Sequence, residues 1–329
     1  MAPTVLPAGD NTMRAWADFR RAGVLDYFRA ELTYDTAKPP ADATPSRFEF
    51  WKHNPNGTWT DETATLLPKG SAGCVHPRKV LVADFNGDGR PDLFVGCTGY
   101  DAPPFPGETS KVVLSQADGT YAISDASPRI AYTHGSSAAD INGDGKIDII
   151  ATDSNSPERA YVLVNDGTGH FAVEAPGRLP TAVTTSNGGW YSLELVDVDG
   201  DGKLDLVMGG HEFQNAPNSV FINPGTSQFA SVTPVVLPAV ADQGVSLDYT
   251  VTGSGSSRAI WISRTSGSAT STSFYQSRVV QKVAYPSLGS TVVLDKEPGA
   301  WMPWLIPAIV NGQAVVTSDN ESEAVSFPQ

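Results

Sequence analysis

The stretch from Val80 to Val95 reads Val80-Leu81-Val82-Ala83-Asp84-Phe85-Asn86-Gly87-Asp88-Gly89-Arg90-Pro91-Asp92-Leu93-Phe94-Val95. It places an apolar run on each side of a loop rich in aspartate and glycine. The loop that begins at Asp84 begins again at Asp140 and at Asp197, so its spacing is 56 and then 57 residues. Self-similarity at a nearly fixed period is typical of repeat architectures.

A second element recurs between these loops. Val162–Phe171 resembles Val113–Tyr121, and further copies lie at Phe50–Trp59 and Val220–Phe229. Each has apolar strand residues around a turn of Asn, Asp or Gly, which predicts a β-hairpin. One repeat therefore contains two hairpins, or four strands, which is the composition of a propeller blade.

The repeats predict an all-β chain that forms one closed β-propeller domain of four-stranded blades over residues 1–329. We expect six blades, with seven as the alternative. Their boundaries are expected near residues 8–67, 68–128, 129–180, 181–238, 239–287 and 288–329. The sixth repeat stops one strand short, so residues 2–7 are expected to complete the last blade and leave no free sheet edge.

The acidic loops have the composition of a calcium site. Side-chain oxygens fall at loop positions 1, 3, 5 and 9, position 7 offers a backbone carbonyl, and glycines at positions 4 and 6 tolerate a positive φ. Calcium takes six or more oxygens at about 2.3–2.6 Å. One Ca²⁺ per loop, three in all, is predicted, with the following residues as ligands: Asp84, Asn86, Asp88, Arg90 and Asp92; Asp140, Asn142, Asp144, Lys146 and Asp148; Asp197, Asp199, Asp201, Lys203 and Asp205.

Two other interpretations of these loops are less consistent with the sequence. An EF-hand requires flanking helices and a glutamate at position 12, where this chain has Val95, Ala151 and Met208. A metal-free turn would crowd three or four carboxylates without a cation, which costs repulsion. In the first repeat, by contrast, Arg20 and Ala22 replace the middle ligands, so that blade is expected to bind no metal.

The three loops resemble the FG-GAP or VCBS repeats of integrin α-subunit heads and of many bacterial and fungal secreted proteins. The resemblance extends over the chain at the level of blades, but it is specific only for the metal loops. It implies that each loop joins the first two strands of a blade and binds calcium on one face of the propeller. It also implies a secreted or cell-surface protein, in which calcium is structural rather than catalytic.

Composition excludes some functions. The net charge is −14 and no Lys/Arg stripe is present, which argues against a nucleic-acid partner. The sequence contains no run of about 18 apolar residues, the length that a membrane-spanning helix requires. The start at Met1 lacks the features of a signal peptide, so we expect a mature domain or an excised piece, and a larger multidomain chain is left open.

The two cysteines, Cys74 and Cys97, bracket one predicted hairpin. A cross-strand disulfide is favoured over two buried thiols, and it would point to an oxidising compartment.

The ligand site is expected on the face opposite the calcium loops, where the repeats differ from one another. Aromatic rings beside acids and amides suit sugar recognition, although the same rings could simply pack between blades. The candidate residues are Tyr100, Asp101, His134, Trp190, His211, Glu212 and Trp301. A binding or adhesion module for a glycan or an extracellular protein is favoured. The alternative is a polysaccharide lyase or hydrolase that uses these acids and histidines.

Overall fold

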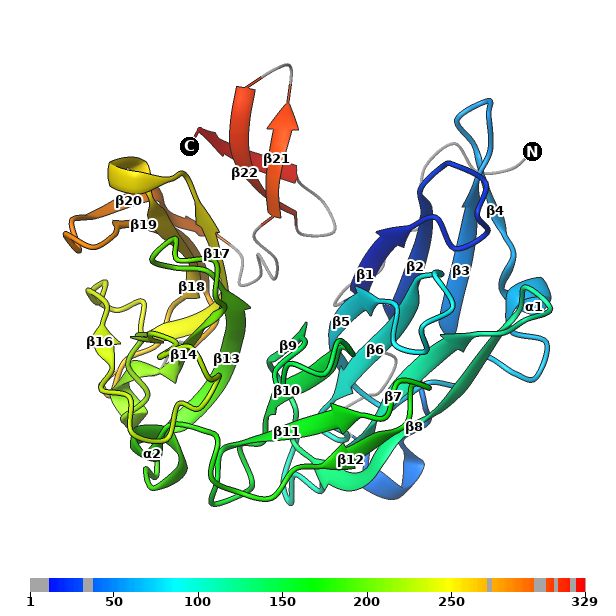
Figure 1. Cartoon of the computed structure of the whole chain (residues 1–329), viewed down its shortest axis with the longest axis horizontal. Coiled ribbons are helices and arrows are strands. Elements are labelled where there is room, and N and C mark those ends of the chain that lie inside the picture. Colours follow the sequence, from blue (N-terminus) through cyan, green and yellow to red (C-terminus); the bar gives the residue numbers. More distant parts are fainter. Residues whose placement is uncertain are drawn as a thin grey trace. The chain divides into compact units, whose positions relative to one another are not determined.

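The computed structural model describes residues 12–31, 38–270, 274–298, 306–310, 313–319 and 324–328. Most of the regular structure within these ranges is antiparallel β-sheet (Figure 1). By its internal contacts the chain divides into two compact units, each considered by itself. The first unit comprises Met1–Ala151 and Val162–Glu174, and the second comprises Thr152–Tyr161 and Ala175–Gln329.

The first two sheets are built from consecutive strands, each paired with the next along the chain. The first sheet consists of β1 (Thr12–Ala17), β2 (Asp26–Glu31), β3 (Phe48–His53) and β4 (Trp59–Asp61). The second consists of β5 (Pro77–Ala83), β6 (Asp92–Cys97), β7 (Glu108–Ser115) and β8 (Tyr121–Ala131).

The next two groups of four strands follow the same order. The third sheet consists of β9 (Ser136–Ala139), β10 (Asp148–Thr152), β11 (Ala160–Asn165) and β12 (Phe171–Val173). The fourth group consists of β13 (Gly189–Val196), β14 (Asp205–His211), β15 (Ser219–Phe221) and β16 (Val235–Val236).

The fifth group consists of β17 (Val245–Thr252), β18 (Ala259–Thr265), β19 (Ser277–Ala284) and β20 (Ser290–Pro298). A single residue pair, His211 with Val245, joins it to β14, so that the fourth and fifth groups form one eight-stranded sheet. Three further strands form a separate sheet, namely β21 (Ile306–Val310), β22 (Gln313–Asp319) and β23 (Ala324–Pro328).

The helices within the described ranges are single turns. They are α1 (Thr63–Leu66), α2 (Thr181–Thr184) and the 3₁₀ turns η1 (Pro40–Asp42), η2 (Glu212–Gln214) and η3 (Gly255–Ser257). The prediction of an all-β chain with four-stranded antiparallel sheets is confirmed. The expected closing strand at residues 2–7 lies outside the described residues.

The strand cores follow from the continuous apolar runs of the sequence. All six residues of β6 are buried, as are all seven of β18, which is the pattern of strands covered on both faces. In the second unit the core packs apolar side chains of several strands together. These are Val198, Val207, Val220, Leu237, Tyr249, Ile260, Ile262 and Val283.

The strand register places every acidic loop at the same end of its sheet. Ala83 pairs with Asp92 and Val196 pairs with Asp205, so each loop joins the first strand of a sheet to the second. The loop at Asp140 has the same register through Asp148. We call this the loop end of a sheet and the opposite end the far end.

Candidate metal centres and ligand sites

The ninth residue of each acidic loop is a fully buried aspartate. The Asp205 carboxylate accepts hydrogen bonds from the backbone N–H groups of Val198, at 2.8 Å, and Asn223, at 2.7 Å. Asp92 and Asp148 make the matching bonds in their own sheets. This side chain therefore connects the loop to the end of the third strand.

The first residue of each loop organises the glycine turn. Asp197 accepts from the N–H groups of Gly200, at 2.6 Å, and Gly202, at 3.1 Å, and these glycines have φ values of 89° and 84°. Only residues that tolerate a positive φ adopt this backbone easily. Asp84 and Asp140 make equivalent bonds, so the three loops share one backbone design.

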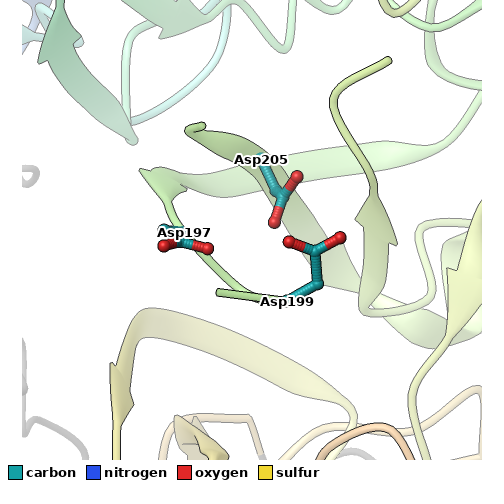
Figure 2. A group of neighbouring side chains, drawn as sticks. All are labelled: Asp197, Asp199 and Asp205. Carbon is teal, nitrogen blue, oxygen red and sulfur yellow. The ribbon is translucent and has the colours of Figure 1, made fainter. Parts of the chain in front are cut away.

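Carboxylate oxygens gather in the third loop. One oxygen each from Asp197, Asp199 and Asp205 lies within 4.8 Å of the others (Figure 2). Two ligands on opposite sides of a calcium ion are about 4.8 Å apart, so these oxygens fit one coordination sphere. Asn86 and Asn142 stand at the position of Asp199 in the other loops, where an amide oxygen replaces the carboxylate.

The electrostatics of the loops favour a cation. Burial raises the pKa of Asp205, and the negative charge of Asp199 raises it further. Burial likewise raises the pKa of Asp148, with smaller contributions from Asp144 and Asp140. A divalent ion at the loop would offset this desolvation and repulsion, because it favours the charged form of every ligand. The donor set of the third loop, with its three gathered carboxylates, thus fits a divalent cation such as calcium.

The seventh position carries a basic residue whose predicted role is to offer its carbonyl. The Lys203 ammonium contacts the Asp201 carboxylate, and the Lys146 Nζ lies 3.3 Å from an oxygen of Asp144. Both lysines are half-exposed, at 48% and 41%, so each can turn into solvent when an ion takes its place. Arg90 instead donates to two carbonyls in the second hairpin of its sheet.

An aromatic cluster lies at the far end of β14, six residues beyond Asp205. It comprises Tyr191, His211, Phe213, Phe274 and Tyr275, whose neighbouring ring centroids are 4.4–6.4 Å apart. Two of its members, Phe274 and Tyr275, are 36% and 38% exposed. The cluster therefore presents ring faces to solvent.

Hydrogen bonds orient the histidine of this aromatic cluster. The two ring nitrogens of His211 lie 3.0 Å from Gln214 Oε1 and 3.1 Å from Tyr275 Oη. Burial lowers the pKa of His211 to about 4, with the Gln214 bond opposing the shift. His211 is therefore neutral at pH 7, and its Nδ1–H donates to Gln214 while Nε2 accepts from Tyr275.

The Glu212 side chain is only 14% exposed and pairs with groups inside the protein. Its Oε1 lies 3.0 Å from a guanidinium nitrogen of Arg264, whose side chain is fully buried, and it accepts from Asn218 at 2.6 Å. Arg264 also donates to Gln281 at 2.7 Å. Glu212 is thus part of a buried ion pair. Trp190, 2% exposed, is likewise a core residue, and its indole N–H donates to Ser186.

A second group of polar side chains lies at the far end of β5 and β6. The Asp101 carboxylate contacts the Arg78 guanidinium and the Tyr132 hydroxyl, and it lies 3.7 Å from His76 Nδ1. The His134 ring lies against Tyr132, with centroids 4.9 Å apart. We call these five residues the Asp101 cluster.

The surroundings of the Asp101 cluster set the protonation state of His76. Burial lowers the pKa of His76 well below its usual range, and Arg78 and His134 add to the effect. The Tyr100 hydroxyl donates to the Lys38 carbonyl, and Tyr100 is 5% exposed. The imidazole of His76 is therefore neutral at pH 7, as a base requires.

The cysteines flank this same region. Cys74 and Cys97 form a disulfide that connects the segment before β5 to the far end of β6. Of the other predicted site residues, Trp301 lies outside the described residues.

Comparisons with known proteins agree with this geometry. The model of the FG-GAP-like repeat matches residues 18–95 and 140–208, which include the loops at Asp84, Asp140 and Asp197. The chain thus carries FG-GAP-like repeats over these residues.

Two relatives of the chain come from Mus musculus. Integrin alpha-IIb is 28% identical over 211 residues, covering 56% of this chain and 20% of the integrin. Cartilage acidic protein 1 is 30% identical over 187 residues, covering 52% of this chain and 26% of that protein. The chain thus spans only about a fifth to a quarter of the length of these relatives.

Among solved structures, a proposed 6-phosphogluconolactonase from Bacteroides fragilis superposes with a TM-score of 0.52 at 10% identity. The superposed region covers 98% of this chain and 83% of the Bacteroides fragilis chain. At this identity the likeness is one of fold alone.

Sequence reasoning missed several members of the two far-end groups, the aromatic cluster and the Asp101 cluster. Phe213 adjoins the predicted Glu212, while Phe274 and Tyr275 come from a hairpin more than 60 residues away. Arg78 and Tyr132 lie close to predicted residues in sequence, but the sequence analysis did not select them as candidates. Tyr132-Thr133-His134 alternates along an extended segment, and that period of two was the available signal.

Proposed function

We propose that this protein is an extracellular binding module whose closed, six-bladed propeller is stabilised by three calcium ions. Three observations support this proposal: the four-stranded sheets, the three loops with one backbone design, and the acidic triad formed by Asp197, Asp199 and Asp205. The disulfide suits an oxidising compartment outside the cytosol. Within the described residues no helix is long and apolar enough to cross a bilayer.

The observation that carries the proposal is the polarity of β14. Asp205 begins the strand in the acidic triad, and His211 ends it in the aromatic cluster. At about 3.4 Å per residue the two ends are about 20 Å apart, so an ion at the loop end cannot contact a ligand at the far end. This separation supports a structural role for calcium and leaves the aromatic cluster as the proposed site of ligand recognition.

The chemistry of the aromatic cluster favours a carbohydrate ligand. Exposed ring faces stack on the apolar faces of pyranose rings, and Tyr275 Oη and Gln214 supply hydrogen-bonding groups beside them. Glu212 is paired with Arg264 and His211 is neutral, so these two neighbours add no net charge to the surface. A neutral glycan suits such a surface better than an acidic one. An extracellular protein is the other class of ligand that this surface could bind.

A calcium titration tests the structural part of the proposal. Protein stripped with excess EDTA should unfold several degrees below the protein in millimolar Ca²⁺, because a ligand that binds only the folded state raises its stability. Three ions should bind per chain. Equal melting temperatures with and without calcium would contradict a structural role for the metal.

A glycan array tests the binding part. Tyr275→Ala should lower binding at least tenfold, since stacking and a hydroxyl are lost together. Trp16→Ala provides the matched control, because Trp16 is exposed to a similar extent, 37%, in the first sheet. Equal losses in both variants, or no reproducible glycan binding by the parent, would contradict the assignment. A pull-down with extracellular proteins then decides whether the ligand is a protein.

The Asp101 cluster favours a second candidate function, a polysaccharide-processing enzyme. Asp101 holds Tyr132 and faces His76, which is how a carboxylate orients groups that transfer protons. Lyase and hydrolase assays on neutral and acidic polysaccharides would detect product if this is correct. Product formation that disappears in Tyr132→Phe and His134→Ala, while Tyr275→Ala keeps it, would place catalysis in this cluster.

Closure of the ring by residues 2–7 remains a proposal with its own test. Deleting these residues should lower the melting temperature sharply, because the last sheet would then expose a strand edge. An unchanged melting curve would refute closure by this segment.

A further inference from the structure

The first repeat keeps the backbone of a metal loop without keeping its ligands. Its loop runs from Asp18 to Asp26, and Ala17 pairs with Asp26 just as Ala83 pairs with Asp92 in the second sheet. Positions 4 and 6 of the metal loops are glycines with positive φ. In the first loop these positions are Arg21 (φ 53°) and Gly23 (φ 74°), so the left-handed turns are retained.

Backbone hydrogen bonds of both outer aspartates are retained as well, those of Asp18 within the turn and that of Asp26 to the third strand. Asp18 accepts from the N–H groups of Ala22 and Gly23, both at 2.7 Å, as Asp84 does from the corresponding positions of its own loop. Asp26 accepts from the His53 N–H at 3.1 Å, at the end of the third strand of its sheet. The first loop therefore positions two of the carboxylates that would hold an ion.

Arg20 distinguishes the first loop from the three acidic loops. It stands at position 3, where the metal loops have Asn or Asp, and its guanidinium binds Asp26 through both oxygens. Nε donates to Oδ2 at 2.8 Å, and Nη2 donates to Oδ1 at 2.7 Å. Asp26 is only 2% exposed, so this charge needs compensation inside the protein. A two-pronged bond to a planar cation supplies it.

We propose that the Arg20 guanidinium takes the role of a metal ion in the first loop, where this side chain fills the place that an ion would take in an acidic loop. Arg20 gives Asp26 a permanent positive partner, so the first sheet needs no calcium while the three acidic loops do. The inference rests on the proposed calcium function. It implies that the loop becomes a metal site when Arg20 and Ala22 are replaced by the ligands of the second repeat, because the backbone and both outer aspartates are already in place.

The test compares bound calcium per full-length chain in the parent and in the Arg20→Asn/Ala22→Asp double variant, by equilibrium dialysis against Ca²⁺ and metal analysis. The double variant should bind one more ion than the parent, and its melting temperature should depend more strongly on calcium. An equal number of ions in the two folded proteins would overturn the inference. A parent that binds no calcium would instead overturn the proposed function, so the two failures are distinguishable.

A single variant keeps the inference testable if the double variant does not fold. Arg20→Gln cannot compensate Asp26 and does not restore the ligand at position 5. Its melting temperature should fall by several degrees, to the same extent in calcium and in EDTA, because no external ion replaces the guanidinium. Arg21→Gln is the control, since Arg21 only donates to the Gly89 carbonyl at 3.2 Å on the surface. A melting temperature of Arg20→Gln equal to that of the parent would overturn the inference.

Discussion

The two ends of the sheets are built on opposite plans. At the loop end, three loops repeat one register, one pair of left-handed glycines and one buried aspartate. At the far end, one sheet ends in a disulfide and the Asp101 cluster, whereas another ends in the aromatic cluster and the ion pair of Glu212 with Arg264. The repeated end therefore provides a common scaffold, and the varied end gives each sheet its own chemistry.

The comparison also shows that stability is not confined to the repeated end. Glu212, next to His211 in the chain, forms a largely buried ion pair with Arg264, and the disulfide joins the segment before β5 to the far end of β6. Far-end residues that differ between repeats are therefore of two kinds. Some face solvent, and others are buried and stabilise the positions of the exposed ones. Substitutions at each end can separate these roles.

Glu212→Ala should have the largest effect on stability. It leaves the fully buried Arg264 guanidinium without its carboxylate, and breaking a buried pair in this way costs about 3–5 kcal/mol. Urea denaturation at pH 7 in millimolar Ca²⁺ measures the loss. The Glu212→Ala/Arg264→Met double variant is the control and should recover part of it, because no uncompensated charge remains. A Glu212→Ala protein as stable as the parent would show that the pair is not structural.

Removing the disulfide should cost somewhat less. The bridge joins residues 23 apart in sequence, and a loop of that size restricts the unfolded chain by about 3 kcal/mol. Urea denaturation of the Cys74→Ser/Cys97→Ser variant measures this. A reductant should lower the stability of the parent by the same amount and should leave the stability of the variant unchanged. A variant as stable as the oxidised parent would mean that the far end of β6 is held by packing alone.

At the loop end, Asp205→Asn should cost about 2 kcal/mol in EDTA, because an amide cannot accept both backbone hydrogen bonds. The variant should also respond less to calcium than the parent does. Asp201→Asn is the control, since Asp201 is an exposed predicted ligand. It should lower calcium binding but leave stability in EDTA unchanged. If both variants behave alike in EDTA, the loop aspartates do not have the separate roles assigned to them.

The sequence predicted the repeated end well because repetition is visible in one chain. Three copies of one spacing defined the strands around Asp84, Asp140 and Asp197, and the family comparison and sheet topology agree with them. Arg20 was correctly noted as a departure from the ligand pattern. Its bond to Asp26 could not be read from the sequence, because only a folded loop shows which carboxylate the guanidinium reaches.

The far end was predicted only in outline. His211 and Glu212 are neighbours in the chain, yet one joins an exposed ring cluster and the other a buried ion pair with Arg264. Trp190 was a candidate because it is aromatic, and it is buried, while the adjacent Tyr191 contacts His211. Such assignments depend on which hairpins meet in space, and a single sequence without repeats at these positions does not contain that information.

The smallest effect concerns the pH dependence of stability at the far end. His211 has a pKa of about 4 in the folded protein because burial disfavours the charged ring, whereas an unfolded histidine titrates near 6.5. As the pH falls from about 6.5 to 4, the unfolded chain gains a proton at this position and the folded protein does not. Stability therefore decreases across that window, and below pH 4 this contribution no longer changes.

The ring retains some contact with solvent, so the effect should be about 1–2 kcal/mol. His211→Gln should flatten the pH profile by that amount between pH 6.5 and 4, as measured by urea denaturation at constant Ca²⁺. A His211→Gln profile parallel to that of the parent would show that the ring accepts its proton in the folded state. In that case the aromatic cluster would carry a positive charge at mildly acidic pH, and acidic glycans would become the better ligands.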